Sequence, residues 1–305
     1  MDREHILKAA AAFSEDSPTN YLSPPAGADA EKSFSANNFS KNNMPFGGDV
    51  SALDRDKSER YVGMRFFMPP IMAVGRADDP RFEELKNENV VGPHHRLPED
   101  WLPGARSVIS LFLPYSERVI KSNTEDPAEP SYEWLFTRVD GQQHLLAMGK
   151  LVCSLLQQEG YRAVVPQTED SYCMRTSAEQ QLPIPVWSSN WSERHVAYVT
   201  GLGTFGRMTN IITKKGCCGR LISIVTDWET EPDERDYEGL YDYCCDCGKC
   251  YSACPAGALS PQGKDKTLCA PFLRAIGKKY APRYGCGKCQ SGLPCSTTYF
   301  GKNKK

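Results

Sequence analysis

The sequence predicts a mixed α/β body joined to a C-terminal cysteine-rich module. Three apolar runs bounded by Gly, Pro or charged residues, at 107–113, 163–165 and 221–225, are typical of strands. Between the first two runs, apolar residues follow helical spacing over 142–158. Strands that alternate with helices indicate an α/β or mixed α+β body. Nine of the 13 cysteines fall between residues 244 and 295, which sets the module apart from the body.

The first 60 residues are rich in Ser, Asn, Asp and Gly, a composition that predicts an arm without a packed core. A short helix at about 3–13 is the one periodic piece expected there. Further along, the stretch 228–242 carries seven acids and one Arg, and we expect it to connect the body to the module. The predicted domains are therefore an arm (1–60), an α/β domain for cofactor and substrate (61–228) and the cysteine-rich domain (229–305).

The module begins with a motif in which Cys244, Cys247, Cys250 and Cys254 are followed by a proline. The spacing C-x2-C-x2-C-x3-C-P is typical of bacterial ferredoxins that bind [4Fe–4S] clusters, where the fourth cysteine binds the neighbouring cluster. A second group downstream supplies the thiolates that this arrangement needs. We assign Cys244, Cys247, Cys250 and Cys295 to one cluster (the first cysteine set), and Cys254, Cys269, Cys286 and Cys289 to the other (the second cysteine set).

Two other uses of cysteine fit less well. A zinc ribbon takes four ligands in two pairs, whereas this module offers eight thiolates. Disulfide frameworks belong to short secreted chains, and Met1 leads into no signal segment. Two [4Fe–4S] clusters in a reducing cytoplasm are therefore expected. The remaining cysteines are expected in the core, and the pair Cys217-Cys218 in a turn beside another group.

The net charge of −2 hides an asymmetry. Residues 261–305 carry ten Lys or Arg against one Asp, a local charge of +9, and the rest of the chain carries −11. A basic surface can steer an acidic electron donor or a polyanion toward the module, or it can be an ordinary solvated face. No apolar run approaches the length of about 18 residues that spans a membrane, so no membrane partner is expected.

A second helix is expected from Ser192 to Thr200, and a glycine-rich turn follows it. The turn, which begins at Gly201, has the pattern G-x-G-x-x-G. A dinucleotide site would need a strand before this pattern and a helix after it, and neither is expected here. The glycines instead allow positive φ or a close approach of the backbone. The approaching body is either a neighbouring strand or a planar cofactor.

Taken in order, several motifs resemble the epoxyqueuosine reductase and reductive dehalogenase superfamily over roughly residues 60–295. They are the segment 101–109, the glycine turn, the strand that ends in Thr226-Asp227, and both cysteine groups. The resemblance implies a nitroreductase-like α/β domain that holds base-off cobalamin, fused to a two-cluster ferredoxin-like module that delivers electrons. It also implies that the corrin ring lies against Gly201, Gly203, Gly206, Thr209 and Asn210.

The sequence departs from this family at its proton donor. Epoxyqueuosine reductases carry an Asp-Tyr-His stretch at the start of a helix, and that stretch falls here on 142–144. Gln142 cannot act as a general acid, and the Tyr of the dehalogenases has no counterpart at this place. Asp140 is therefore the first candidate acid and His144 the second. The structural alternatives are Asp140 as a helix N-cap and His144 as a core or surface residue.

These observations predict a cytoplasmic iron–sulfur oxidoreductase that reduces a small-molecule substrate. Cobalamin is a candidate second cofactor, and a ferredoxin or flavodoxin is the expected electron donor. Two alternatives stay open: a dedicated electron carrier without a substrate of its own, and a tRNA-modifying reductase. The missing acid at Gln142 disfavours the tRNA alternative.

Overall fold

The computed structural model describes residues 1–23, 59–176, 187–281 and 283–301. The central part of the predicted arm, 24–58, and the last four residues lie outside this description. Among the described residues, no helix combines the length and the apolar character needed to cross a membrane. The helices and short 3-10 turns are α1 (Arg3–Asp16), η1 (Pro18–Asn20), η3 (Glu59–Tyr61), α4 (Arg81–Glu84), α5 (Pro98–Trp101), α6 (Glu117–Ser122), α7 (Tyr132–Val139), α8 (Gln142–Gln158), η4 (Pro166–Thr168), α9 (Glu193–Val199), α10 (Lys249–Ser252) and α11 (Lys266–Lys279).

A four-stranded sheet in the order β1-β2-β8-β3 forms the centre of the body, and every pairing in it is antiparallel. The three predicted strands are confirmed, although the antiparallel order makes the body an α+β arrangement. The strands of this sheet and of three small hairpins are β1 (Ile71–Arg76), β2 (Ser107–Pro114), β3 (Ala163–Val164), β8 (Gly219–Thr226), β4 (Met174–Thr176), β5 (Trp187–Ser189), β6 (Gly203–Phe205), β7 (Ile211–Thr213), β9 (Leu259–Ser260) and β10 (Gly263–Lys264).

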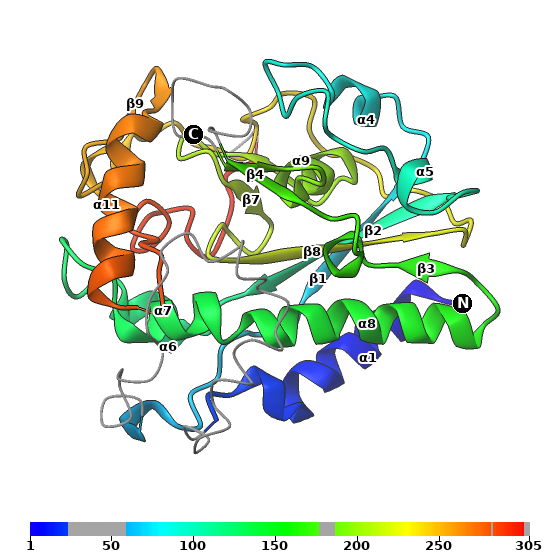
Figure 1. Cartoon of the computed structure of the whole chain (residues 1–305), viewed down its shortest axis with the longest axis horizontal. Coiled ribbons are helices and arrows are strands. Elements are labelled where there is room, and N and C mark those ends of the chain that lie inside the picture. Colours follow the sequence, from blue (N-terminus) through cyan, green and yellow to red (C-terminus); the bar gives the residue numbers. More distant parts are fainter. Residues whose placement is uncertain (24–58, 177–186, 282, 302–305) are drawn as a thin grey trace.

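Helices cover both faces of the sheet (Figure 1). Alternate residues of a strand point to opposite faces. Ile222 and Ile224 of β8 accordingly join the core under α8, whereas Val225 joins the core under α9. The α8 side is also covered by α1, whose Ile6 and Ala10 are fully buried. The predicted N-terminal helix is therefore confirmed, but it packs into the body's core and is not part of a free arm.

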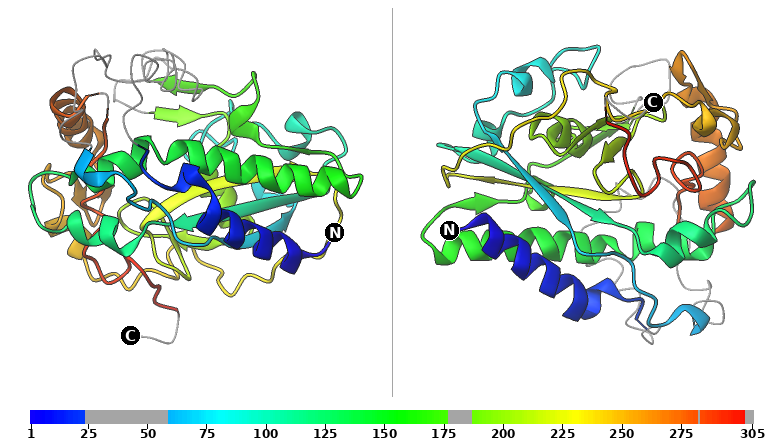
Figure 2. Two further views of the ribbon diagram at one scale, coloured as in Figure 1. Left: turned by 90° about the horizontal axis from the view of Figure 1, so that it is seen from below. Right: turned by 180° about the vertical axis from the view of Figure 1, so that it is seen from behind.

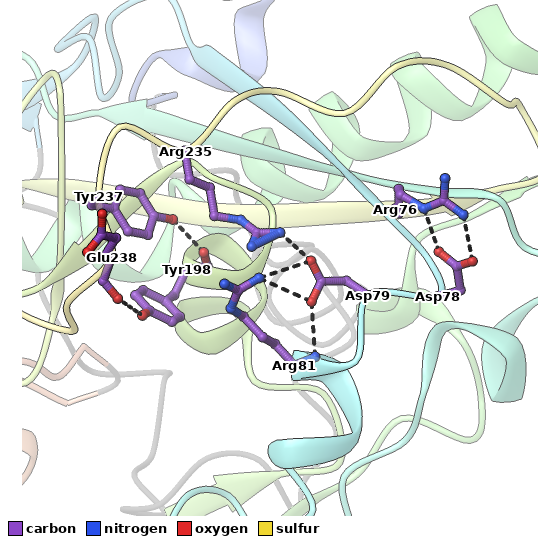
Figure 3. Close-up of polar contacts among 8 residues, drawn as sticks. All are labelled: Arg76, Asp78, Asp79, Arg81, Tyr198, Arg235, Tyr237 and Glu238. Atoms are coloured by element: carbon purple, nitrogen blue, oxygen red, sulfur yellow. Dashed lines mark hydrogen bonds and ion pairs between the residues drawn. The ribbon is translucent and has the colours of Figure 1, made fainter.

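The acidic connector is fastened to the body. Asp233 pairs with the edge of β1, since its backbone N–H donates to the Val74 carbonyl at 2.7 Å and its carboxylate accepts from the Val74 N–H at 2.6 Å. Nearby, the Asp79 carboxylate lies between the guanidinium groups of Arg81 and Arg235 (Figure 3). Figure 3 also shows Tyr237 donating to the carbonyl of Tyr198 on α9. The connector thus holds the module against one end of the sheet, where Figure 2 shows α11 and the C-terminal loops.

Packing also crosses the predicted boundary at 228/229. One apolar cluster contains Met208 and Ile212 from the β6–β7 hairpin together with Tyr243 and Leu259 from the module. The hairpin and the module therefore share a core.

Candidate functional site

The first cysteine set lines one cavity of about 310 Å³, open solvent at its mouth included. All four of its thiols belong to the lining, beside Met208 and Leu293. The local backbone explains how three of them reach this place: Asp246 and Gly248 both have positive φ, so the chain turns tightly around the cavity before α10 begins. The fourth, Cys295, arrives from a distant segment, as the crossed assignment predicts.

The pair Cys217-Cys218 fixes that distant segment to the body. The Cys217 N–H donates to the Cys295 carbonyl at 2.9 Å, and the Cys218 N–H donates to the Ser296 carbonyl at 3.1 Å. A Cβ on Gly216, which has φ +80°, would lie 2.4 Å from the Ser296 oxygen. The group that the sequence predicted beside this turn is therefore the segment of the module that contains Cys295 and Ser296.

The second cysteine set is gathered next to α7 and the first turn of α11. Burial raises the pKa of Cys286 to about 12, and the neighbouring thiols of Cys289 and Cys254 raise it further. Burial likewise raises the pKa of Cys289, with contributions from Cys254 and Cys269. These contributions place Cys286 and Cys289 both within electrostatic range of Cys254. They also favour a bound cation, because a metal that coordinates thiolates relieves the cost of ionising buried thiols.

The two sets lie side by side. Burial raises the pKa of Cys250 to about 12, and the thiols that add to this effect are Cys244 and Cys295 of its own set and then Cys289 of the second. No three described His, Cys, Asp or Glu side chains converge closely enough to hold a single metal ion. The four cysteines of the first set instead line the one cavity described above. Of the unassigned cysteines, Cys153 is buried as predicted, whereas Cys173 and Cys245 are exposed and the core prediction is wrong for them.

The glycine turn leads into a β-hairpin. Gly203 lies in β6, where an added Cβ would stand 2.2 Å from the Ile212 carbonyl oxygen of β7. A Cβ on Gly206 would stand 2.3 Å from the Met208 sulfur, and Gly201 has φ +94° beside Arg235. The sequence left two explanations for these glycines, a neighbouring strand or a planar cofactor. The close approach of the neighbouring strand β7 explains the glycine at Gly203. The contacts that favour glycine at Gly203 and Gly206 therefore come from the hairpin itself.

The other two predicted corrin contacts also have partners within the chain. The backbone oxygen of Thr209 accepts from Arg194 at 3.2 Å, and the Asn210 amide donates to the Cys217 carbonyl at 3.3 Å. Thr209 has positive φ, which fits its place in the tight hairpin loop.

We expect Gly203→Val to disrupt the hairpin. The substitution forces a branched side chain into the Ile212 carbonyl, and such overpacking costs about 1–3 kcal/mol or more. Thermal unfolding should show a lower melting temperature in the absence of any added cofactor. Unchanged thermal stability with a specific loss of cobalamin binding would instead support a cofactor cradle at this turn.

Asp140 is held in an ion pair away from any cavity lined by the cysteines. Both carboxylate oxygens accept from Arg283, at 2.8 and 3.1 Å. Asp140 is the C-cap of α7, and the N-cap of α8 is Gly141, so the N-cap interpretation is wrong. The ion pair engages both carboxylate oxygens of Asp140, and this geometry argues against Asp140 as the acid.

His144 lies on the α1 side of α8. Its ring stacks between Phe13 and Phe67 with centroids 5.2 and 5.8 Å away, and Nδ1 lies 2.9 Å from the Thr19 hydroxyl. Burial lowers the pKa of His144 to about 4, so the ring is neutral at pH 7. This is the core histidine of the structural alternative, and the position does not suit a proton donor.

Gln142 instead belongs to a polar network on the sheet side of α8. Its Oε1 accepts from Arg220 of β8 at 2.6 Å, and its Nε2 faces Gln167 at 3.4 Å. Gln167 donates in turn to Glu193 in the first turn of α9, at 3.0 Å. Burial raises the pKa of Glu193 to about 7, against the opposing effect of hydrogen bonds from Ser223 and Gln167. Sequence reasoning missed Glu193 because only the fold brings it near Gln142.

His195 lies in α9, the helix that also carries Glu193. Its Nδ1 lies 2.7 Å from the Ser192 hydroxyl. Ser192 is the N-cap residue of α9, but its side chain contacts this ring and does not form the capping hydrogen bond that the sequence predicted. Burial lowers the pKa of His195 to about 4.

Comparison with known proteins shows that this chain is similar to known reductases. An epoxyqueuosine reductase of Bacillus cereus is 26% identical over 210 residues, which are 65% of this chain and 50% of that protein. One from Leadbetterella byssophila is 26% identical over 242 residues, 70% of each chain. A tetrachloroethene reductive dehalogenase of Desulfitobacterium hafniense is 34% identical over 109 residues, 33% of this chain and 20% of that protein. The chain is thus similar to epoxyqueuosine reductases over about two thirds of its length and to reductive dehalogenases over about one third.

The chain spans about half the length of the Bacillus relative. No protein-family model matches it. Among solved structures, a crystal structure of an epoxyqueuosine reductase aligns with 77% of this chain and 62% of its own, at 20% identity and a TM-score of 0.46. A catabolic reductive dehalogenase aligns with 74% of this chain and 30% of its own, at 14% identity and a TM-score of 0.48.

Proposed function

We propose that this chain is an iron–sulfur reductase that binds two [4Fe–4S] clusters and reduces a small molecule at the polar network around Gln142. One observation carries the proposal: all four thiols of the first cysteine set line one cavity, although Cys295 comes from a distant segment. The clusters, when bound, supply one-electron transfer between an external donor and the site of reduction. A role in the cytoplasm follows from the need to keep these thiolates reduced.

The order of the two sets fits this function. Residues that touch the second set also touch the polar network, since Gly285 precedes Cys286 and lies beside Arg138, whose carbonyl accepts from Arg220. Cys247 of the first set is exposed and offers that set one point of access from solvent. Because the second set is the one beside the polar network, electrons would leave from it. The basic segment 261–305 suits an acidic donor such as a ferredoxin or flavodoxin.

Glu193 replaces Asp140 and His144 as the proposed proton donor. A reduction that adds electrons to a substrate also consumes protons, and a positioned acid contributes typically about 10²–10⁴-fold. An acid serves best when its pKa lies near the working pH, and the pKa of Glu193 is raised to about 7. A buried amide chain through Gln167 connects this carboxyl to Gln142.

The proposal does not depend on cobalamin. The residues predicted to face a corrin ring pack against their own hairpin, so no step is assigned to that cofactor here. A titration of the anaerobic, reduced protein with cobalamin, followed by its visible spectrum, measures the affinity directly.

Two cluster sites predict about eight irons and eight acid-labile sulfides per chain, because each set of four thiolates matches one [4Fe–4S] cluster. Cys295→Ala should lower both values to about four, since this side chain belongs to the first set alone. Iron and sulfide analysis of anaerobically purified protein checks the prediction. Cys153→Ala is the matched control, because Cys153 is a buried core residue that should leave the iron content unchanged. Zinc in place of iron would contradict the proposal.

Two further measurements separate the alternatives. A dedicated electron carrier would show reducible clusters but no acceleration of substrate reduction. A tRNA-modifying enzyme would bind tRNA with an affinity that falls steeply as salt rises.

The free energy of unfolding should depend on pH in a way that reports the raised pKa of Glu193. Its folded pKa of about 7 lies above the ordinary 4.5, so the folded state holds the proton more tightly than the unfolded state. This contribution to the free energy of unfolding is fully present below pH 4.5 and is lost as the pH rises toward and past 7. As the pH rises from 4.5 to 8, the free energy of unfolding of Glu193→Gln should therefore increase by about 1–2 kcal/mol relative to that of the wild type, allowing for the partial exposure of the side chain. Denaturant unfolding of both proteins at pH 4.5 and pH 8 measures this change. If the difference between variant and wild type is the same at both pH values, Glu193 is not the proposed acid.

A further inference from the structure

Two guanidinium groups meet beside Gln142. Arg220 of β8 donates through Nη1 to the Arg138 carbonyl at 2.8 Å and through Nη2 to the Gln142 side chain at 2.6 Å. Arg138 ends α7, and its Nη1 is buried without a hydrogen-bond acceptor. Within the described part of the chain, neither arginine forms an ion pair with a carboxylate. Buried cations of this kind normally have an anionic partner.

The charge at this place is unbalanced. Burial and the neighbouring Arg138 lower the pKa of Arg220 to about 10, and both guanidinium groups still carry their charge at pH 7. The acid that interacts with Arg220 is Glu193, whose own pKa is raised to about 7. Much of the compensating negative charge is therefore missing, and an anionic ligand would supply it.

The pair faces the second cysteine set. The Arg138 guanidinium lies over the Tyr284 ring, 5.0 Å from its centroid, and a Cβ on Gly285 would lie 3.3 Å from the Arg138 side chain. Both contacts come from the two residues that precede Cys286. Arg194 of α9 interacts electrostatically with Arg138 and with Cys289 of the second set, and adds a third cation.

We propose that Arg138 and Arg220 bind the anionic group of a small organic substrate, a carboxylate, phosphate ester or phenolate, next to the second cysteine set. The inference rests on the proposed function, which needs a substrate near that set. Planar guanidinium groups recognise such anions by paired, charge-assisted hydrogen bonds. The burial of the Arg138 Nη1 favours a small anion over the phosphate backbone of a nucleic acid, which stays at the protein surface.

Calorimetric titration of the iron-loaded protein with benzoate and with inorganic phosphate tests the proposal at constant ionic strength. We expect saturable binding in the millimolar range or tighter, weakened at least tenfold in Arg138→Gln and in Arg220→Gln. Arg220→Lys, which keeps the charge but loses the paired geometry, should weaken binding less than Arg220→Gln. Arg76→Gln is the matched control, since Arg76 is an exposed arginine paired with Asp78, and its affinity should equal that of the wild type.

Equal anion affinity in the wild type and Arg138→Gln would overturn the proposal, as would an absence of saturable binding to iron-replete protein. Competition by bulk tRNA, with no binding of either small anion, would point to a nucleic-acid phosphate as the ligand and would also overturn it. The iron content is measured on the same samples. Failure of the anion site with eight irons present leaves the proposed function intact, whereas normal anion binding without iron refutes the function alone.

Discussion

Gly287→Ala is expected to abolish the second cluster site and to destabilise the chain by about 3–5 kcal/mol. Gly287 stands between Cys286 and Cys289 with φ +69°, a conformation that costs other residues about 1–2 kcal/mol. A Cβ there would lie 2.0 Å from the ring of Trp134, a buried side chain of α7. The Trp134 ring and the backbone at Gly287 are both held in place, so the cost of overpacking adds to the cost of the backbone strain. The iron content of the variant should fall to about four per chain, and denaturant unfolding should measure the loss of stability.

Gly63→Ala separates the two causes. Gly63 has φ +78° and no atom within 4 Å of an added Cβ, so it carries the backbone cost without the collision. We expect this variant to keep its full iron content and to lose about 1–2 kcal/mol. Similar losses in both variants would show that the contact with Trp134 does not position the second set.

Acid should unfold the chain between pH 6.5 and 4, because three histidines are buried in their neutral form. Burial lowers the pKa of His95, His144 and His195 from 6.5 to about 4 in each case. The unfolded state binds protons more tightly than the folded state in this range, so their contribution is present above pH 6.5 and is lost as the pH falls. Together they are expected to remove on the order of 3–6 kcal/mol, a large share of a typical stability of about 5–15 kcal/mol.

His95→Phe tests the contribution of one ring. His95 is 2% exposed and neither of its nitrogens has a hydrogen-bond partner. Relative to the wild type, the variant should gain about 1–2 kcal/mol between pH 7.5 and 5, measured by denaturant unfolding. The comparison between variants cancels any acid loss of the clusters themselves. His5→Phe, at an exposed position on α1, is the control, and an equal gain there would refute the explanation.

The sequence predicted the elements whose signals are local. The spacing of apolar residues placed the helix at 142–158 to the residue, and the strands around Ile109 and Ile224 were found in the same way. Helical spacing did not show which face of α8 each residue takes. Gln142 and His144 are two residues apart, about 200° around the helix, so one faces the sheet and the other faces α1.

The parts that could not be predicted depend on long-range contacts. Glu193 enters the site through Gln167 and Gln142, residues that lie 26 and 51 positions earlier and share no motif with it. Gly203 looked like a cofactor contact because its pattern fits several uses, and only the pairing with Ile212 decides among them. Cys295 could be placed with the first set in spite of its distance because the crossed ligand pattern specifies a fourth thiolate in advance, and it lines the same cavity as the other three cysteines.

The strand order β1-β2-β8-β3 has a consequence for how the protein is made. The sheet is complete once Thr226 has been synthesised, whereas Cys295 is added 69 residues later. At translation rates of about 5–20 residues per second, this leaves roughly 3 to 14 seconds between the two events. In the proposed iron–sulfur protein, iron and sulfide would therefore meet a chain whose sheet residues are already made, and Cys217-Cys218 would offer the incoming segment two backbone hydrogen bonds.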